Sequence, residues 1–184
     1  MASFNEFLPI LLRFEGGFVD DPDDPGGATN KGITLQTFRT CANNLLGIEP
    51  TLDNLRNLTD AQAGTIYQAL YWNKVHGDEI ALQELANIVC DFFVNAGGSA
   101  AKLLQTILNE MHSGVEVDGV IGPACVRALA AADQAEVYSR YKQGRINYYQ
   151  DLAQRQPSLA KFLKGWLNRV NAFPDIQSGR AKTS

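Results

Sequence analysis

Apolar residues recur at helical spacing along most of the sequence, and this periodicity limits the folds that are open to the chain. Such stripes are typical of amphipathic helices that turn one face toward a core. We find them in residues 4–14, 35–46, 52–58, 60–72, 82–95, 99–113, 123–129, 134–152 and 158–170. A short β-ribbon around residues 18–33 is the one exception that we expect. The sequence therefore predicts a mainly α fold.

One stretch, Arg13 to Thr34, interrupts the helical pattern. It reads RFEGGFVDDPDDPGGATNKGIT, and it holds one glutamate, four aspartates, five glycines and two prolines. Gly costs backbone entropy inside a regular element and Pro removes a hydrogen-bond donor, so this stretch cannot be a helix or a central strand. A loop of this length between helices is uncommon unless it is functional or disordered, and its regular punctuation by Pro and Gly argues against disorder. We interpret it as a functional site.

Glu15 stands where the first predicted helix ends, immediately before two glycines that are typical of a helix terminus. The negative end of the helix dipole disfavours an ionised carboxylate at such a position, by roughly 0.3 to 1 kcal/mol when it is exposed. A general acid needs this bias toward the neutral form. The alternative interpretation is a surface glutamate at a frayed helix end.

Four aspartates follow Glu15 within nine residues, namely Asp20, Asp21, Asp23 and Asp24. A glycine-rich turn lets this arm fold back toward Glu15, so that two carboxylates face one substrate. Glycoside hydrolysis uses such a pair, because a protonated carboxyl gives its proton to the leaving oxygen while an ionised one assists water or attacks directly. For at least two of the four, the alternative is turn formation, since Asp favours turns and two prolines lie among them.

The run from Glu15 to Thr34 resembles the signature of glycoside hydrolase family 108, a group of bacterial and phage N-acetylmuramidases. It is also similar to phage lysozymes, where Glu, Asp and Thr follow one another at similar spacing. The resemblance implies a lysozyme-like helical domain with Glu15, Asp24 and Thr29 as the catalytic residues. We take Asp21 as a substrate-binding residue, with Asp20 and Asp21 as alternatives for the second acid.

The match departs from these families at two positions. Eight residues separate Glu15 from Asp24 and four more separate Asp24 from Thr29, whereas the phage lysozyme pattern has one residue more before its Thr. Phe18 stands where the family usually has Tyr, which removes a hydroxyl and keeps an aromatic ring. We expect activity to survive this change.

Two pairs of residues at helix ends are further candidates for substrate binding. Tyr71 and Trp72 resemble a pair that recurs in the family, and aromatic faces can stack on the apolar C–H faces of sugars; the alternative is core packing. Asp91 and Asn95 are four residues apart and so share a helix face, in a D-x-x-x-N-x-G pattern that resembles the family. We predict that this face lines the cleft opposite Glu15; the alternative is a polar helix face capped by Asn95.

Two motifs in the second half of the chain suggest its organisation. The run V-D-G-V-I-G-P, Val117 to Pro123, resembles small helical peptidoglycan-binding repeats, although Cys125 replaces their Thr; a tight turn and a helix entry would explain it equally well. The G-W-x-x-R run that ends at Arg169 resembles the end of the family. We predict a lysozyme-like catalytic part at residues 1–114, a peptidoglycan-binding-like part at 115–174 packed on it as one compact unit, and a frayed tail at 175–184.

Composition excludes several other classes of function. The net charge of −4 gives no support for binding nucleic acid. Three cysteines, an odd and widely spaced set, indicate buried thiols rather than a disulfide framework, and neither of the two histidines has metal-ligand spacing, so we expect no metal and no cofactor. No stretch approaches the length of a membrane span, and no signal peptide opens the chain, so we expect cytoplasmic synthesis and no membrane insertion.

The sequence therefore predicts a peptidoglycan hydrolase of the endolysin type that cleaves the β-1,4 bond between N-acetylmuramic acid and N-acetylglucosamine. We expect a monomer that acts on glycan strands in the periplasm or outside the cell, after export through a holin pore or a secretion machine. Three alternatives remain: a non-catalytic peptidoglycan-binding module, a lytic transglycosylase, and a helical adaptor for protein partners. A phage, a prophage and a secretion system are equally open as its origin.

Overall fold

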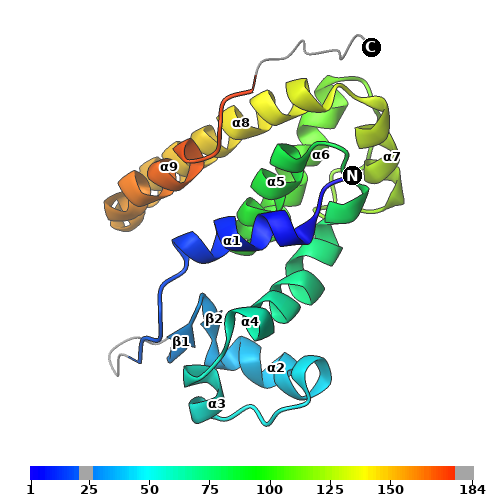
Figure 1. The fold of residues 1–184 in the computed structure, drawn as a ribbon. Helices are drawn as coiled ribbons and strands as arrows, with labels where there is room; N and C mark the ends of the chain where they lie inside the picture. The colour runs from blue at the N-terminus through cyan, green and yellow to red at the C-terminus, as the bar shows by residue number, and fades with distance from the viewer. Residues whose placement is uncertain (21–26, 177–184) are drawn as a thin grey trace. The chain divides into compact units, whose positions relative to one another are not determined.

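The computed structural model describes residues 1–20 and 27–176, and helices dominate this part of the chain (Figure 1). The α-helices are α1 Phe4–Phe14, α2 Leu35–Leu46, α3 Leu52–Arg56, α4 Asp60–Tyr67, α5 Gln83–Ala96, α6 Gly98–Glu110, α7 Pro123–Ala131, α8 Gln134–Arg155 and α9 Leu163–Asn171. Two short strands, β1 Thr29–Asn30 and β2 Ile33–Thr34, pair antiparallel. The prediction of a mainly α fold with a short ribbon is confirmed. Over the same residues, no helix is long and apolar enough to cross a membrane.

The chain packs as two compact units, and the predicted division near residue 114 between a catalytic part and a peptidoglycan-binding-like part stays a prediction. The N-terminal unit comprises Phe4–Asn73, and the C-terminal unit comprises Met1–Ser3 and Lys74–Ser184. The physical reason is that α5 and α6 pack on α8, so they belong with the later helices. Of the predicted tail, only Asp175 and Ile176 are described, and the rest lies outside the described residues.

Side-chain caps fix several of the helix starts that the sequence predicts. Thr34 accepts a hydrogen bond from the Thr37 amide at the start of α2, and Thr59 forms a complete capping box with Gln62 at the start of α4. The last stretch is different. We predicted a helix from Ser158, but a 3₁₀ turn occupies Pro157–Phe162 and α9 begins only at Leu163.

Aromatic packing forms the core of the N-terminal unit. The ring of Trp72 stacks on Phe7, with centroids 5.5 Å apart, and meets Phe4 edge-on at 5.7 Å. Gly64 of α4 lies so close to α1 that a Cβ atom there would come within 2.7 Å of the Leu8 side chain. Pro9 is accommodated inside α1, which begins at Phe4 as predicted. These contacts hold α1 in place within the N-terminal unit, and with it the residue that follows its end.

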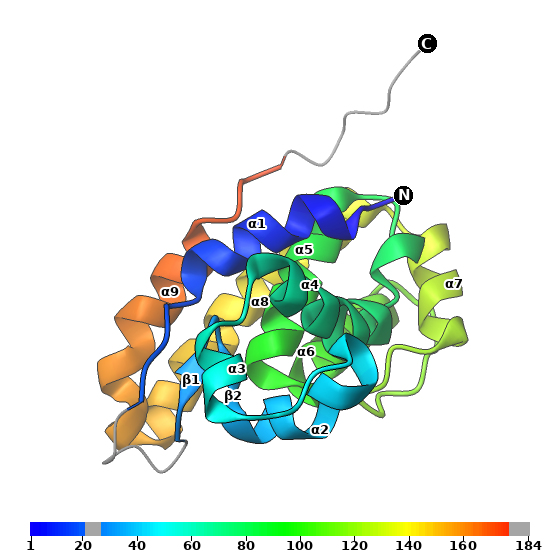
Figure 2. The same ribbon diagram turned by 60° about the horizontal axis from the view of Figure 1, so that its bottom comes forward.

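The C-terminal unit is built from α5, α6, α8 and α9, which pack against one another, with α7 beside α6 (Figure 2). The buried side chain of Gln105 in α6 fixes the loop that follows: its amide donates to Asp118 and to the Val120 carbonyl, and its oxygen accepts from the Gly119 amide. Pro123 then opens α7 as its first residue.

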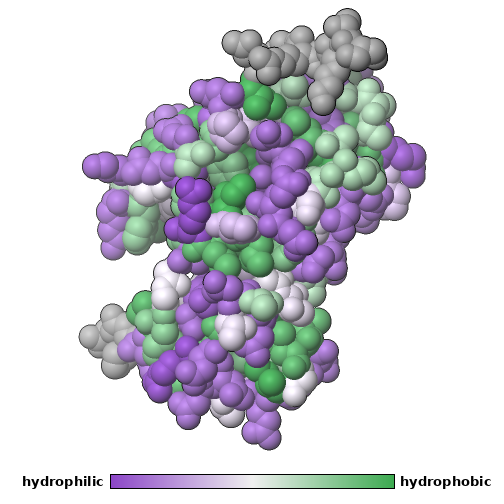
Figure 3. All heavy atoms as spheres, in the orientation of Figure 1, coloured by the Kyte–Doolittle hydropathy of each residue, from purple (hydrophilic) through white to green (hydrophobic). Residues whose placement is uncertain are grey.

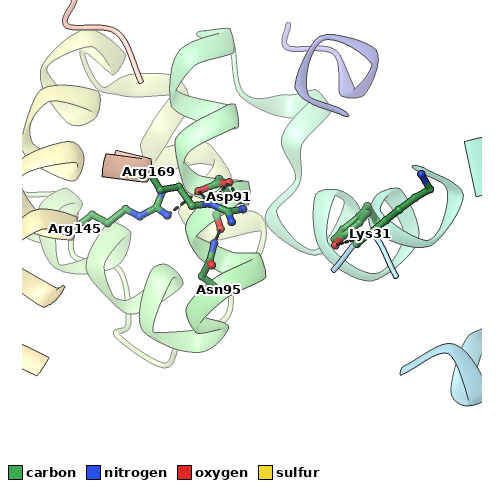
Figure 4. Close-up of polar contacts among 6 residues, drawn as sticks. Lys31, Asp91, Asn95, Arg145 and Arg169 are labelled. Carbon is green, nitrogen blue, oxygen red and sulfur yellow. Dashed lines mark hydrogen bonds and ion pairs between the residues drawn. The ribbon is translucent and has the colours of Figure 1, made fainter. Parts of the chain in front are cut away.

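A buried ion-pair network joins three helices of this unit. The Asp91 carboxylate of α5 accepts from Arg145 of α8 at 2.7 Å and from Arg169 of α9 at 2.8 Å (Figure 4). The side chains of Asp91 and Arg145 are 0% exposed. The Arg145 guanidinium also lies over the Phe92 ring, 4.9 Å from its centroid. One anion thus holds two cations from distant parts of the chain.

Removing this anion should destabilise the C-terminal unit strongly. We expect Asp91→Ala to lower the free energy of unfolding by about 3–5 kcal/mol, because it leaves a buried guanidinium uncompensated. Urea unfolding followed by circular dichroism measures this. The matched control is Glu136→Ala in α8, which breaks an exposed pair with Arg140 and should cost about 0.3–0.5 kcal/mol. Equal effects of the two substitutions would contradict the structural role of Asp91.

Candidate active site

Glu15 follows the last residue of α1 directly, as the sequence predicts, and its side chain is half-buried. The chain then turns back over the end of the helix. The amide of Lys31 donates to the carbonyl of Gly16 at 3.1 Å, and Val19 exchanges two backbone hydrogen bonds of 2.8 Å with Thr29. These bonds bring the β1–β2 turn against Glu15.

The turn itself is a two-residue hairpin loop formed by Lys31 and Gly32, which have φ angles of 50° and 74°. Positive φ at both central residues is typical of a type I′ turn, which matches the twist of the two strands. Gly32 faces the Glu15 carboxyl: a Cβ atom at this position would lie 2.3 Å from Glu15 Oε2 and 2.4 Å from the Tyr67 hydroxyl oxygen. Only glycine fits this approach.

Tyr67 of α4 completes this arrangement. Its ring is buried, and its hydroxyl donates to the Lys31 carbonyl at 2.8 Å, which ties the hairpin turn to α4. The Lys31 ammonium pairs with Asp60 at the start of the same helix, at 2.6 Å. The Glu15 carboxyl and the Tyr67 hydroxyl therefore converge on one backbone position, and the turn is held there from two sides.

The other predicted catalytic residues are placed less completely. Thr29 lies in β1, and its hydroxyl makes a long contact of 3.5 Å with the Gly27 carbonyl. Asp20 is exposed next to the ribbon. Asp21 and Asp24 lie outside the described residues, so their roles stay predictions.

The predicted aromatic pair is divided between core and surface. Trp72 is 0% exposed in the core of the N-terminal unit, so we correct its assignment: it packs against α1 and has no free face for a sugar. Tyr71 is half-buried beside Tyr67, with ring centroids 5.6 Å apart. Its assignment to substrate binding stays a prediction.

The polar pair that we predicted to bind substrate, Asp91 and Asn95, lies in α5. Asp91 is fully buried, and both of its carboxylate oxygens accept from arginines, so it is withdrawn as a substrate-binding residue. Asn95 is exposed, and its amide donates to the Asp91 carbonyl within the helix at 2.6 Å. Its role in sugar binding stays a prediction.

Other groups with potential chemistry have structural roles. The Val120 amide and Gln105 hold the pKa of Asp118 below its usual value, which fits a turn-forming carboxylate. The three cysteines are free and buried, and burial raises the pKa of Cys125 to about 11, so its thiol is unreactive. Within residues 1–20 and 27–176, no cluster of three or more His, Cys, Asp or Glu side chains could hold a metal.

Comparison with known proteins identifies the family of the chain. A family model described as Glycosyl hydrolase 108 matches residues 8–97, and one described as Predicted Peptidoglycan domain matches residues 99–171. The solved structure of Brucella abortus SagA is 33% identical, with a TM-score of 0.73, and the match covers 92% of this chain and 90% of SagA. The chain belongs to glycoside hydrolase family 108. It is therefore a glycoside hydrolase, and the family implies peptidoglycan as the polymer that it cleaves. A search of curated proteins found no match.

Sequence reasoning missed two residues that contact Glu15 or its turn in this candidate site, Gly32 and Tyr67. Lys31-Gly32 after a polar pair is a hairpin signal, and it could have predicted the turn. The sequence predicts that the arm after Glu15 folds back toward it, but it does not indicate that Gly32 is the residue that meets the Glu15 carboxyl, because this contact depends on tertiary packing. Tyr67 falls within the helical stripe predicted at residues 60–72, and nothing in that pattern marks it as part of a site.

A side chain at Gly32 should disturb the Glu15 carboxyl. We expect Gly32→Ala to lower hydrolysis of purified sacculi by about 10²-fold, since a displacement of about 1 Å in a catalytic group can cost that much. Gly47→Ala is the matched control: it has a φ of 66° but no atom within 4 Å of the added Cβ, so it adds similar strain without a clash. Thermal unfolding measures the strain in both variants. Similar activity of the two variants would contradict a role for Gly32 in placing Glu15.

Proposed function

We propose that this family 108 enzyme hydrolyses the β-1,4 bond between N-acetylmuramic acid and N-acetylglucosamine, with Glu15 as the general acid. The observation that carries this proposal is the position of Glu15 at the end of α1, with its carboxyl packed against Gly32 and beside the Tyr67 hydroxyl. A general acid must keep one orientation relative to the glycosidic oxygen, and a half-buried carboxyl beside a fixed turn meets this requirement.

In this mechanism the Glu15 carboxyl donates its proton to the glycosidic oxygen as the bond to the anomeric carbon breaks. Positive charge develops at that carbon, and water attacks it from the opposite face. Asp24 is the carboxylate that we assign to activating this water or stabilising the charge, with Asp20 and Asp21 as alternatives. Thr29 is the residue that we assign to orienting this water; its hydroxyl makes a long contact of 3.5 Å with the Gly27 carbonyl.

The place of action follows from the substrate. Peptidoglycan lies outside the cytoplasmic membrane, so we propose that the enzyme acts in the periplasm or outside the cell and reaches the wall through a holin pore or a secretion machine. Cell fractionation during wall lysis tests this: recovery of all the enzyme from the cytoplasm would contradict it.

Substitution of Glu15 tests the general acid. Removing such a group costs about 10²–10⁴-fold in rate, so we expect Glu15→Gln to lose this much activity on purified sacculi and to keep its fold. Glu6→Gln, on an exposed position of the same helix, is the matched control and should behave like the wild type. A folded Glu15→Gln enzyme with wild-type activity would refute the assignment. Mass spectrometry of the fragments decides the reaction, since reducing N-acetylmuramic acid ends indicate hydrolysis and anhydro ends indicate a lytic transglycosylase.

The second acid can be identified by a parallel set of substitutions. We expect Asp24→Asn to lower hydrolysis of sacculi by at least about 10²-fold, as the loss of a group that acts on the attacking water does. Asp20→Asn and Asp21→Asn should have smaller effects. The same reducing-end assay measures all three, and a larger loss at Asp20 or Asp21 would transfer the role to that residue.

A further inference from the structure

Four aromatic side chains form a continuous stack in the C-terminal unit that the catalytic proposal does not use. The rings of Tyr149 in α8 and Trp166 in α9 are stacked with centroids 5.0 Å apart, and Phe162 lies 5.9 Å from Trp166. Tyr148 meets Tyr149 edge-on at 5.5 Å. Tyr149 is 4% exposed, Trp166 and Tyr148 are half-buried, and Phe162 is 46% exposed. The stack therefore runs from the core to the surface.

Exposure of the outer ring is unusual for this protein. The other large hydrophobic side chains that are exposed among the described residues are one methionine and three valines, at Met1, Val19, Val117 and Val120. Hydrophobic and hydrophilic groups alternate over the face drawn in Figure 3, and single exposed aliphatic residues of this kind need no explanation. An exposed phenylalanine in contact with a half-exposed tryptophan is a different feature, because it presents adjoining aromatic surface to the solvent.

Side chains of the core also hold the aromatic stack in place. Tyr149 packs on Phe92, with centroids 5.6 Å apart, and the Arg145 guanidinium lies 5.7 Å from the Tyr149 ring centre. Arg169, three residues after Trp166 in α9, pairs with Asp91. The ion-pair network therefore fixes the helix that carries Trp166. A rigid aromatic surface binds a ligand with a small loss of conformational entropy.

The chemistry of this surface favours a glycan of peptidoglycan as its ligand. Sugar rings present apolar C–H faces that match aromatic faces. Lys161, with its ammonium 5.0 Å from the Phe162 centroid, and the exposed Lys164 provide positive charge for the carboxylates of peptidoglycan, in a chain whose net charge is −4. The region matched by the family model Predicted Peptidoglycan domain, residues 99–171, contains the whole stack. By contrast, a hollow of about 670 Å³ between α6 and α7 has no aromatic side chain in its lining.

We propose that Phe162, Trp166 and Tyr148 form a stacking surface for the glycan strands of peptidoglycan, with Lys161 and Lys164 beside it. This proposal rests on the proposed function for its polymer, but it does not depend on Glu15. The surface adds binding energy at sugars other than the pair whose bond is cleaved, or it retains the enzyme on the wall between cleavage events; both require the same contact.

Binding is measured in a Glu15→Gln background, so that the wall is not degraded, by sedimentation with purified sacculi. We expect Phe162→Ala with Trp166→Ala to weaken binding by about tenfold, because the double substitution removes two of the aromatic faces that stack on the sugars. Phe162→Ala alone removes an exposed side chain and should not unfold the protein, and Phe162→Tyr, which keeps the ring, should restore binding. Val120→Ala, a change at another exposed hydrophobic position of the same unit, is the matched control.

Sacculi from which an amidase has removed the peptides identify the ligand. Binding to these naked glycan strands that depends on Phe162 supports the proposal. Binding that depends on Phe162 only when the peptides are present, or binding to anionic lipid vesicles instead of glycan, overturns it, and so does equal binding by Phe162→Ala and the control. If the wild type fails to cleave sacculi while Phe162-dependent binding persists, the proposed function fails and this inference stands.

Discussion

Asp91 accepts hydrogen bonds from two arginines that follow it by 54 and 78 residues, and the C-terminal unit depends on this shared carboxylate. Burying an anion with two cations is costly unless each is paired, so the three helices that carry them can pack in few ways. Cation–π contacts of Arg145 extend the same network into the aromatic core. The position of α9, and with it the aromatic surface around Trp166, follows from this constraint.

Aromatic packing and one hydrogen bond constrain the N-terminal unit in a similar way. Packing of Trp72 on Phe7 holds α1 in place, and the hydroxyl of Tyr67 holds the hairpin turn through the Lys31 carbonyl. Gly32 can approach the Glu15 carboxyl because it has no side chain and tolerates positive φ. The candidate acid is thus placed by packing in the core and by the hairpin turn.

Local signals predicted the helices well where a cap decides their ends. Thr34, Thr59 and Asp133 cap the helices predicted at residues 35–46, 60–72 and 134–152, because a side-chain oxygen three residues or fewer from free amides acts locally. The predicted start of the last helix at Ser158 was wrong, because the chain first forms a 3₁₀ turn that holds Phe162 near Trp166. The prediction of Glu15 rested on its place at a helix end, which is also local, and on the resemblance of the surrounding run to family 108.

The sequence by itself determined the mainly α fold, the ribbon, the family and the position of Glu15 directly after a helix. Tertiary structure alone decided which polar and aromatic residues are available for a ligand. Trp72 and Asp91 have the residue types of a sugar site, yet one is in the core and the other is neutralised by two arginines. Phe162 has the residue type of a core, yet it is exposed. Burial depends on contacts between segments far apart in the chain, and spacing along the sequence does not contain that information.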